Sequence, residues 1–169
     1  MSLSTPHPIW TLAETPFEVS KAATVATMLS GRYVSDHRSR HWSVKNPEGN
    51  CQLCLVSGHP PTPGTLQHQL VSCPGLLETR TNSISHWSAY MSDKPLLLPL
   101  VKQFTLVTGP EAENIFTQFL LDPSACPSVI SAVQQSGPGL LSHLLYMTRT
   151  WCHSNHLKRR RILKLQNII

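Results

Sequence analysis

The chain has 169 residues, of which 40% are hydrophobic and 14% are charged, and its formal net charge is +5. The hydrophobic content excludes a disordered chain, and the length allows one domain with a modest core or a small metal module with helical flanks. The charged fraction is well below the quarter that is usual for a soluble domain. We therefore expect part of the surface to pack against something else, and the positive charge is compatible with a polyanionic partner.

The chain divides into four segments. Residues 1–15 form a loose lead-in, 16–49 a helical basic and aromatic segment, 50–75 a metal-binding element, and 76–169 a helical region with a basic end. Pro16 favours the first turn of a helix, and Gly31 is a natural residue to end it. A second short amphipathic piece is predicted from Arg32 to Trp42, before the turn cluster that begins at Asn46.

This second piece concentrates basic and aromatic side chains. Arginines such as Arg32, Arg38 and Arg40 can contact phosphates, and Trp42 can stack on an unpaired base. In the alternative interpretation, Trp42 belongs to the core and the arginines form a solvated face. The sequence leaves both readings open.

The most specific pattern is C-x2-C-x13-H-x4-C, formed by Cys51, Cys54, His68 and Cys73. A close Cys pair followed by a His/Cys pair is typical of a tetrahedral structural zinc site. We therefore predict one structural Zn²⁺ held by three thiolates and one imidazole, with no open coordination position for catalysis. The sulfurs of Cys51 and Cys73 are expected within about 4.6 Å of each other, because each lies about 2.3 Å from the ion.

The spacing of the last two ligands requires a break in the helix. Thr65 can cap a helix that carries His68, but residues 68 and 73 lie about 140° apart on an ideal helix. Pro74 disfavours the α conformation at Cys73, which can then turn back toward the metal. His59 is the rival ligand, although it lies in a proline-rich loop.

Further helices are predicted over residues 76–91, 96–107, 111–121, 127–137 and 139–165. The last is the longest, and its apolar stripe from Leu140 to Cys152 is expected to face the core. Its end is basic, with candidate phosphate contacts at Lys158, Arg159, Arg160 and Arg161 on solvent-facing positions. Since period-2 strand patterns are nearly absent, the predicted fold class is mainly α: short helices around a CCHC zinc-stabilised loop, followed by a long C-terminal helix.

Other signals are negative. The sequence contains no phosphate-binding glycine loop, dinucleotide fingerprint, hydrolase elbow, zinc protease motif or deaminase motif, so we expect neither an enzyme nor a small-molecule substrate. Cys126 and Cys152 are expected to act as small hydrophobic residues. No secretory signal and no run of about 18 apolar residues occur, so we expect an intracellular protein, nuclear or cytoplasmic, with no membrane partner.

Three stretches form a combined pattern: the Leu-x-Gly-x-Tyr helix end at Leu29–Tyr33 with its following arginines, the Cys51-x2-Cys54 pair, and the Thr65-x2-His68-x4-Cys73-Pro74 run. Together they resemble the region after the polymerase in non-LTR (LINE-type) retrotransposon proteins. The closing stretch from Tyr146 to Arg159 is also similar to the end of that family. The resemblance implies a zinc-stabilised module, with the same four ligands, that helps a reverse transcriptase hold RNA and target DNA.

The chain departs from that family in two ways. The polymerase aspartates and the endonuclease are missing, and the loop between the ligand pairs is longer and richer in proline. The resemblance therefore implies a detached tail. Three hypotheses follow: a non-specific RNA- or DNA-binding zinc module, a zinc-stapled helical module whose partner is a reverse transcriptase polymerase domain, and a non-functional truncated product. Leucines 96–98 favour the second.

Overall fold

The computed structural model describes residues 7–10, 13–41, 43–91, 94, 97 and 109–166. The α-helices are α1 (Pro16–Leu29), α2 (Asp36–Ser39), α3 (Gln52–Val56), α4 (Leu77–Met91), α6 (Pro110–Leu121), α7 (Pro127–Ser136) and α8 (Pro138–Leu165). Short 3₁₀ turns cover Pro8–Trp10, Pro74–Leu76 and Pro123–Ala125, and a π-helical turn covers His68–Ser72. The described residues contain no strand, only an isolated bridge between Asn50 and Pro63. The mainly α fold class is thereby confirmed.

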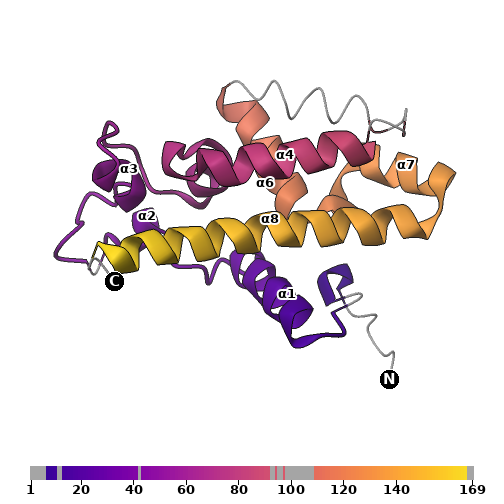
Figure 1. The fold of residues 1–169 in the computed structure, drawn as a ribbon, viewed down its shortest axis with the longest axis horizontal. Coiled ribbons are helices and arrows are strands. Elements are labelled where there is room, and N and C mark those ends of the chain that lie inside the picture. The colour runs from indigo at the N-terminus through magenta and orange to yellow at the C-terminus, as the bar shows by residue number, and fades with distance from the viewer. Residues whose placement is uncertain are drawn as a thin grey trace.

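Helix α8 is the axis of the molecule. It runs along the long dimension, with α4 and α6 on one side and α1 on the other, and α7 folds back beside its N-terminal half (Figure 1). Its C-terminal half reaches the end of the molecule that contains α2 and α3. One helix thus connects the apolar interior to the cysteine-containing loop. None of the helices in the described parts of the chain is long and apolar enough to cross a membrane.

Proline and glycine define most helix boundaries, as the sequence predicted. The hydroxyl of Thr15 accepts the backbone N–H of Glu18 at 3.2 Å, and Pro16 follows as the first helical residue of α1. The helix ends at Leu29, and Gly31 adopts a φ of +67°, which an L side chain disfavours. Proline also opens α6, α7 and α8. The helix predicted at 96–107 lies outside the described residues, apart from Leu97.

The amphipathic segment predicted from Arg32 to Trp42 is longer than the helix that the structure shows. Only α2, a single turn from Asp36 to Ser39, is helical there. The side chain of Ser35 accepts the backbone N–H of Arg38, so Ser35 caps the turn and the residues before it remain outside the helix. This arrangement points the Asp36 side chain into the protein.

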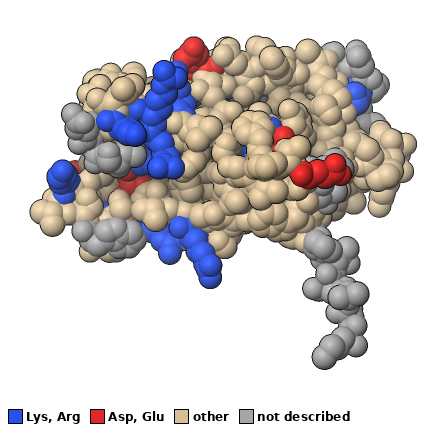
Figure 2. Space-filling model, turned by 60° about the horizontal axis from the view of Figure 1, so that its bottom comes forward, with Lys and Arg blue, Asp and Glu red and all other residues tan. Residues whose placement is uncertain are grey.

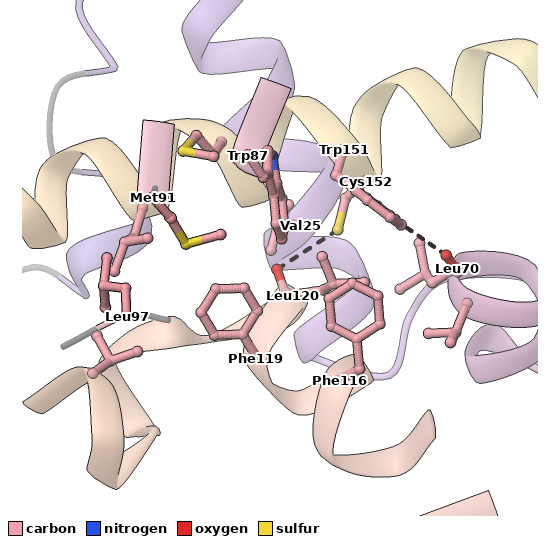
Figure 3. Packing of buried hydrophobic residues seen from close by; sticks show 14 of the residues in the cluster. Val25, Leu70, Trp87, Met91, Leu97, Phe116, Phe119, Leu120, Trp151 and Cys152 are labelled. Atoms are coloured by element: carbon pink, nitrogen blue, oxygen red, sulfur yellow. Dashed lines mark hydrogen bonds between the residues drawn. The ribbon is translucent and has the colours of Figure 1, made fainter. Parts of the chain in front are cut away.

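The core contains four packed aromatic rings from three helices, surrounded by aliphatic side chains. Trp87 of α4, Phe116 and Phe119 of α6, and Trp151 of α8 pack with ring centroids 5.0–6.4 Å apart (Figure 3). Trp151 is 1% exposed, and its indole N–H donates to the carbonyl of Leu70 at 3.1 Å. This bond fixes α8 against the turn that carries a predicted metal ligand. The predicted apolar stripe of α8 is confirmed as core: Leu140, Leu144, Leu145, Trp151 and Cys152 are buried.

Candidate metal centre

The first two cysteines lie at the start of α3 and within it, next to the isolated bridge between Asn50 and Pro63. Cys51 precedes α3, and Cys54 lies within it. The backbone N–H of Cys51 donates to Thr62 at 2.7 Å, while that of His59 donates to Cys54 at 2.8 Å. These bonds fold the proline-rich loop back over α3 and direct both sulfurs inward. His59 itself is exposed and does not belong to the cluster.

The second pair is placed by the π-helical turn. Thr65 caps the backbone N–H of His68 at 3.1 Å, and the N–H of Cys73 donates to the carbonyl of His68 at 2.7 Å. This bond spans five residues, so the turn is wider than an α-helical one. Cys73 has an extended ψ of 116°, as expected before Pro74. The wide turn and the extended cysteine together bring His68 and Cys73 to the same side.

The four predicted ligands converge. The sulfur of Cys73 lies 3.7 Å from that of Cys51 and 3.9 Å from that of Cys54, whose sulfur is 3.2 Å from His68 Nε2. All four ligand atoms lie within 4.8 Å of one another. The three cysteines are fully buried and His68 is 8% exposed. The cluster can therefore hold one metal ion shielded from solvent.

Three thiols in one buried site cannot all ionise easily. A hydrogen bond from Cys73 lowers the pKa of Cys51 to about 3, while burial raises the pKa of Cys54 to about 11. The hydrogen bond to Cys51, followed by burial, raises the pKa of Cys73. The thiolate of Cys51 thus forms readily, and its negative charge opposes the ionisation of the other two thiols. A divalent cation reverses this balance, because it stabilises all three thiolates and displaces their protons.

Neighbouring polar groups orient the ligands. The hydroxyl of Ser72 lies 3.4 Å from His68 Nδ1 and donates to a carboxylate oxygen of Glu113 at 3.5 Å. This series of hydrogen bonds, from His68 through Ser72 to Glu113, favours the tautomer of His68 that carries its proton on Nδ1. The unprotonated Nε2 then faces the cluster. The guanidinium of buried Arg80 donates to the carbonyl of Cys73. Helices α4 and α6 therefore both support the second ligand pair.

Asp36 connects the cysteine-containing loop to α8. One carboxylate oxygen accepts the backbone N–H of Gln52 at 3.1 Å and lies 3.5 Å from the amide of Gln69, and the other is 2.5 Å from the guanidinium of Arg159. Burial raises the pKa of Asp36, and the charge of Arg159 opposes that shift. Gly64 lies against it: a Cβ there would stand 2.5 Å from the Asp36 Cβ. Asp36 is thus a junction that the sequence interpretation did not identify.

The side chains predicted to contact nucleic acid differ in their exposure to solvent. Arg32, Arg38, Arg40, Arg160 and Arg161 are exposed, and within the described residues none of them forms an ion pair with a carboxylate. Lys158 is half-buried and pairs with exposed Glu78 at 3.1 Å. Arg159 is only 9% exposed, so its predicted solvent-facing position is wrong: its guanidinium pairs with Asp36 instead. Trp42 lies outside the described residues.

The Arg159–Asp36 pair brings the two predicted basic stretches to one end of the molecule. In Figure 2, lysine and arginine side chains gather at the end where α2, α3 and the C-terminal half of α8 lie in Figure 1. Lys164, one helical turn beyond Arg160 and Arg161, is also exposed there. We call Arg38, Arg40, Arg160, Arg161 and Lys164 the basic end.

No protein-family model, curated protein or solved structure matches this chain.

Proposed function

We propose that the chain is a non-catalytic module in which a structural Zn²⁺ supports a basic surface that binds single-stranded RNA or DNA through its phosphates. The observation that carries the proposal is the gathering of exposed cations at the metal-centre end. The resemblance to the post-polymerase region of LINE-type retrotransposon proteins is consistent with it, with a reverse transcriptase polymerase domain as a second partner.

The ligand set supports zinc. Around a tetrahedral Zn²⁺, two sulfurs are expected about 3.8 Å apart, and a sulfur and a nitrogen about 3.6 Å apart, from bond lengths near 2.3 and 2.0–2.1 Å. The sulfur–sulfur distances of 3.7 and 3.9 Å agree with this, and the 3.2 Å distance from Cys54 to His68 needs only a small adjustment. Three cysteines and one histidine form a closed shell, which supports a structural role. Measuring bound metal by mass spectrometry would test both identity and stoichiometry.

The surface proposal predicts a salt-dependent interaction. Each phosphate contact on a single strand releases about 0.7 counterion, so log affinity should fall linearly with log salt. Replacing Arg160, Arg161 and Lys164 with glutamine should flatten that slope by up to about 2. The matched control replaces Arg160 and Arg161 with lysine, which keeps the charge and should keep the slope.

Two outcomes would count against this function. An unchanged slope in the glutamine variant would mean that the α8 residues of the basic end form only a solvated helix end. Failure to bind any oligonucleotide at low salt would favour a protein-interaction module instead.

A further inference from the structure

A surface pocket of about 410 Å³ lies between α4 and α8, away from the metal centre. Rings supply much of its lining, namely His86, Trp87, Tyr90, His143 and Tyr146. Asn82 and Thr150 add polar groups. A mostly aromatic hollow of this size with a few polar side chains is typical of a site for a small planar ligand.

The rings around the hollow are partly engaged with one another and with lysines. Tyr90 and His143 stack with centroids 3.6 Å apart at 17°, and Tyr146 lies 6.3 Å from His143. Lys94 Nζ lies 3.7 Å from the Tyr90 centroid and Lys21 Nζ 4.4 Å from the Tyr146 centroid, so a ligand would meet the remaining ring faces and edges. Trp87 is 5% exposed and belongs to the core, whereas Tyr146 is 48% exposed. The pocket therefore has a rigid aromatic interior and an accessible aromatic rim. Burial, with a contribution from Lys94, lowers the pKa of His143, so its ring is neutral at neutral pH.

The pocket shares one face of α8 with the basic end. Tyr146, Thr150, Leu157 and Arg161 follow one another at intervals of four, seven and four residues, which places them on one helical stripe. Leu157, Arg160, Arg161 and Lys164 line a second, open hollow of about 530 Å³. Between the two, Lys158 neutralises the carboxylate of Glu78. Thr150 and Arg161 are about 16 Å apart along the helix.

We propose that the α4–α8 pocket binds an unpaired nucleobase, with the phosphates of the same strand continuing along α8 to the basic end. This inference rests on the proposed function and adds the part of the strand that the basic end cannot recognise. Aromatic faces combined with a cationic track are how single strands are commonly held without sequence preference. The shared chemistry is a planar nitrogen heterocycle, whether it comes from a strand or from a free nucleotide.

The test compares two ligands with equal numbers of phosphates. One is an oligoadenylate of about eight nucleotides, a length within the usual single-strand site sizes, and the other is an abasic oligomer of equal length. By fluorescence anisotropy, the 169-residue chain should bind the first at least about fivefold more tightly. His86→Ala and Tyr146→Ser should reduce this preference, while His59→Ala, which removes another exposed histidine outside the pocket, should not.

Each outcome decides between the two proposals. Equal affinity for both oligomers would overturn the base pocket but leave the phosphate surface intact. A preference that survives both pocket variants would also overturn it. If neither oligomer binds, the proposed function fails, and a titration with adenosine monophosphate then decides the pocket: binding that His86→Ala weakens would retain it as a nucleotide site, and no binding would remove it. Circular dichroism would verify that each variant is folded.

Discussion

The two halves of α8 are held in the protein by different means. The N-terminal half enters a cluster of eighteen buried described residues that includes four large aromatic rings. The C-terminal half contributes Leu163 to a cluster of six, three of which are the cysteines of the metal centre. The first region contains enough apolar surface to be stable through packing. The second contains much less, so we expect its stability to depend on the Arg159–Asp36 pair and on a metal ion held by the cysteines.

Metal removal should produce the largest difference between the two halves. We expect Cys54→Ser, or a chelator, to abolish tight zinc binding and to disorder residues 50–75 together with the end of α8. The aromatic half should keep most of its helical signal. Limited proteolysis would locate the new cleavage sites, and Cys126→Ser, which changes a cysteine outside the cluster, should cause none. If metal removal instead unfolded the whole chain in one cooperative step, the two halves of α8 would not be stabilised separately.

Trp151→Ala tests the opposite half. Truncating a tryptophan that is 1% exposed should cost about 3–5 kcal/mol of unfolding free energy. It also leaves the carbonyl of Leu70 without its donor. Denaturant unfolding would measure the loss, with Trp10→Ala as a control because Trp10 is 44% exposed. Zinc stoichiometry should stay at one wherever the variant is folded, and its loss would show that the halves are one unit.

The helices were largely predictable because local residues determine where they begin and end. Proline at the first turn and Gly31 after the end act through the backbone itself, without help from distant contacts. The four metal ligands were predictable for a related reason, since a metal site demands particular residue types at a particular spacing. The π-helical turn was not: the sequence indicated a break before Pro74 but not the five-residue hydrogen bond that makes it.

The misplacement of Arg159 has a different origin. Its partner Asp36 is 123 residues away, so the residues around Arg159 could not reveal the pair. A useful signal was nevertheless present, because Asp36 is the single carboxylate in a run of histidines and arginines. Such a residue often neutralises a buried cation. Charge alone does not separate a phosphate contact from an internal ion pair.

Breaking the Asp36 junction should have an intermediate effect. Asp36→Asn leaves Arg159 buried without a countercharge, which should cost about 2–3 kcal/mol, somewhat less than for a fully buried pair because the Arg159 side chain keeps 10% exposure. Zinc affinity should also fall about tenfold, because Asp36 orients the loop around the ligands. Denaturation and competition with a chelator would measure the two effects.

A matched control and a rescue sharpen this prediction. Glu78→Gln breaks the exposed pair with Lys158 and should change stability by less than about 1 kcal/mol. The double variant Asp36→Leu/Arg159→Met should recover much of the lost stability, since it buries no unpaired charge. No recovery would mean that the hydrogen bonds of Asp36 matter more than its charge.

The smallest expected effect is a pH dependence in the apolar half. His153 is 6% exposed and bonded to the Thr24 hydroxyl at 3.0 Å, and burial followed by the charge of Lys21 lowers its pKa. The folded protein therefore binds this proton less readily than the unfolded chain. The contribution of neutral His153 to the free energy of unfolding is therefore present above the ordinary histidine pKa near 6.5 and is lost as pH falls below that value. His153→Gln should flatten the decline in stability between pH 7 and 5, measured by thermal unfolding.

The position of Leu163 also bears on how the protein is made. The chain emerges from the ribosome N-terminal end first, so Cys51, Cys54 and Cys73 leave the exit tunnel well before Leu163, which packs in the same buried cluster. During that interval the cysteines lack this apolar neighbour and are accessible to metal ions and to oxidants alike. Early capture of the ion would then protect the thiols until α8 is complete. If the ion is zinc, as proposed, its supply during synthesis should determine the yield of folded protein more than its supply afterwards.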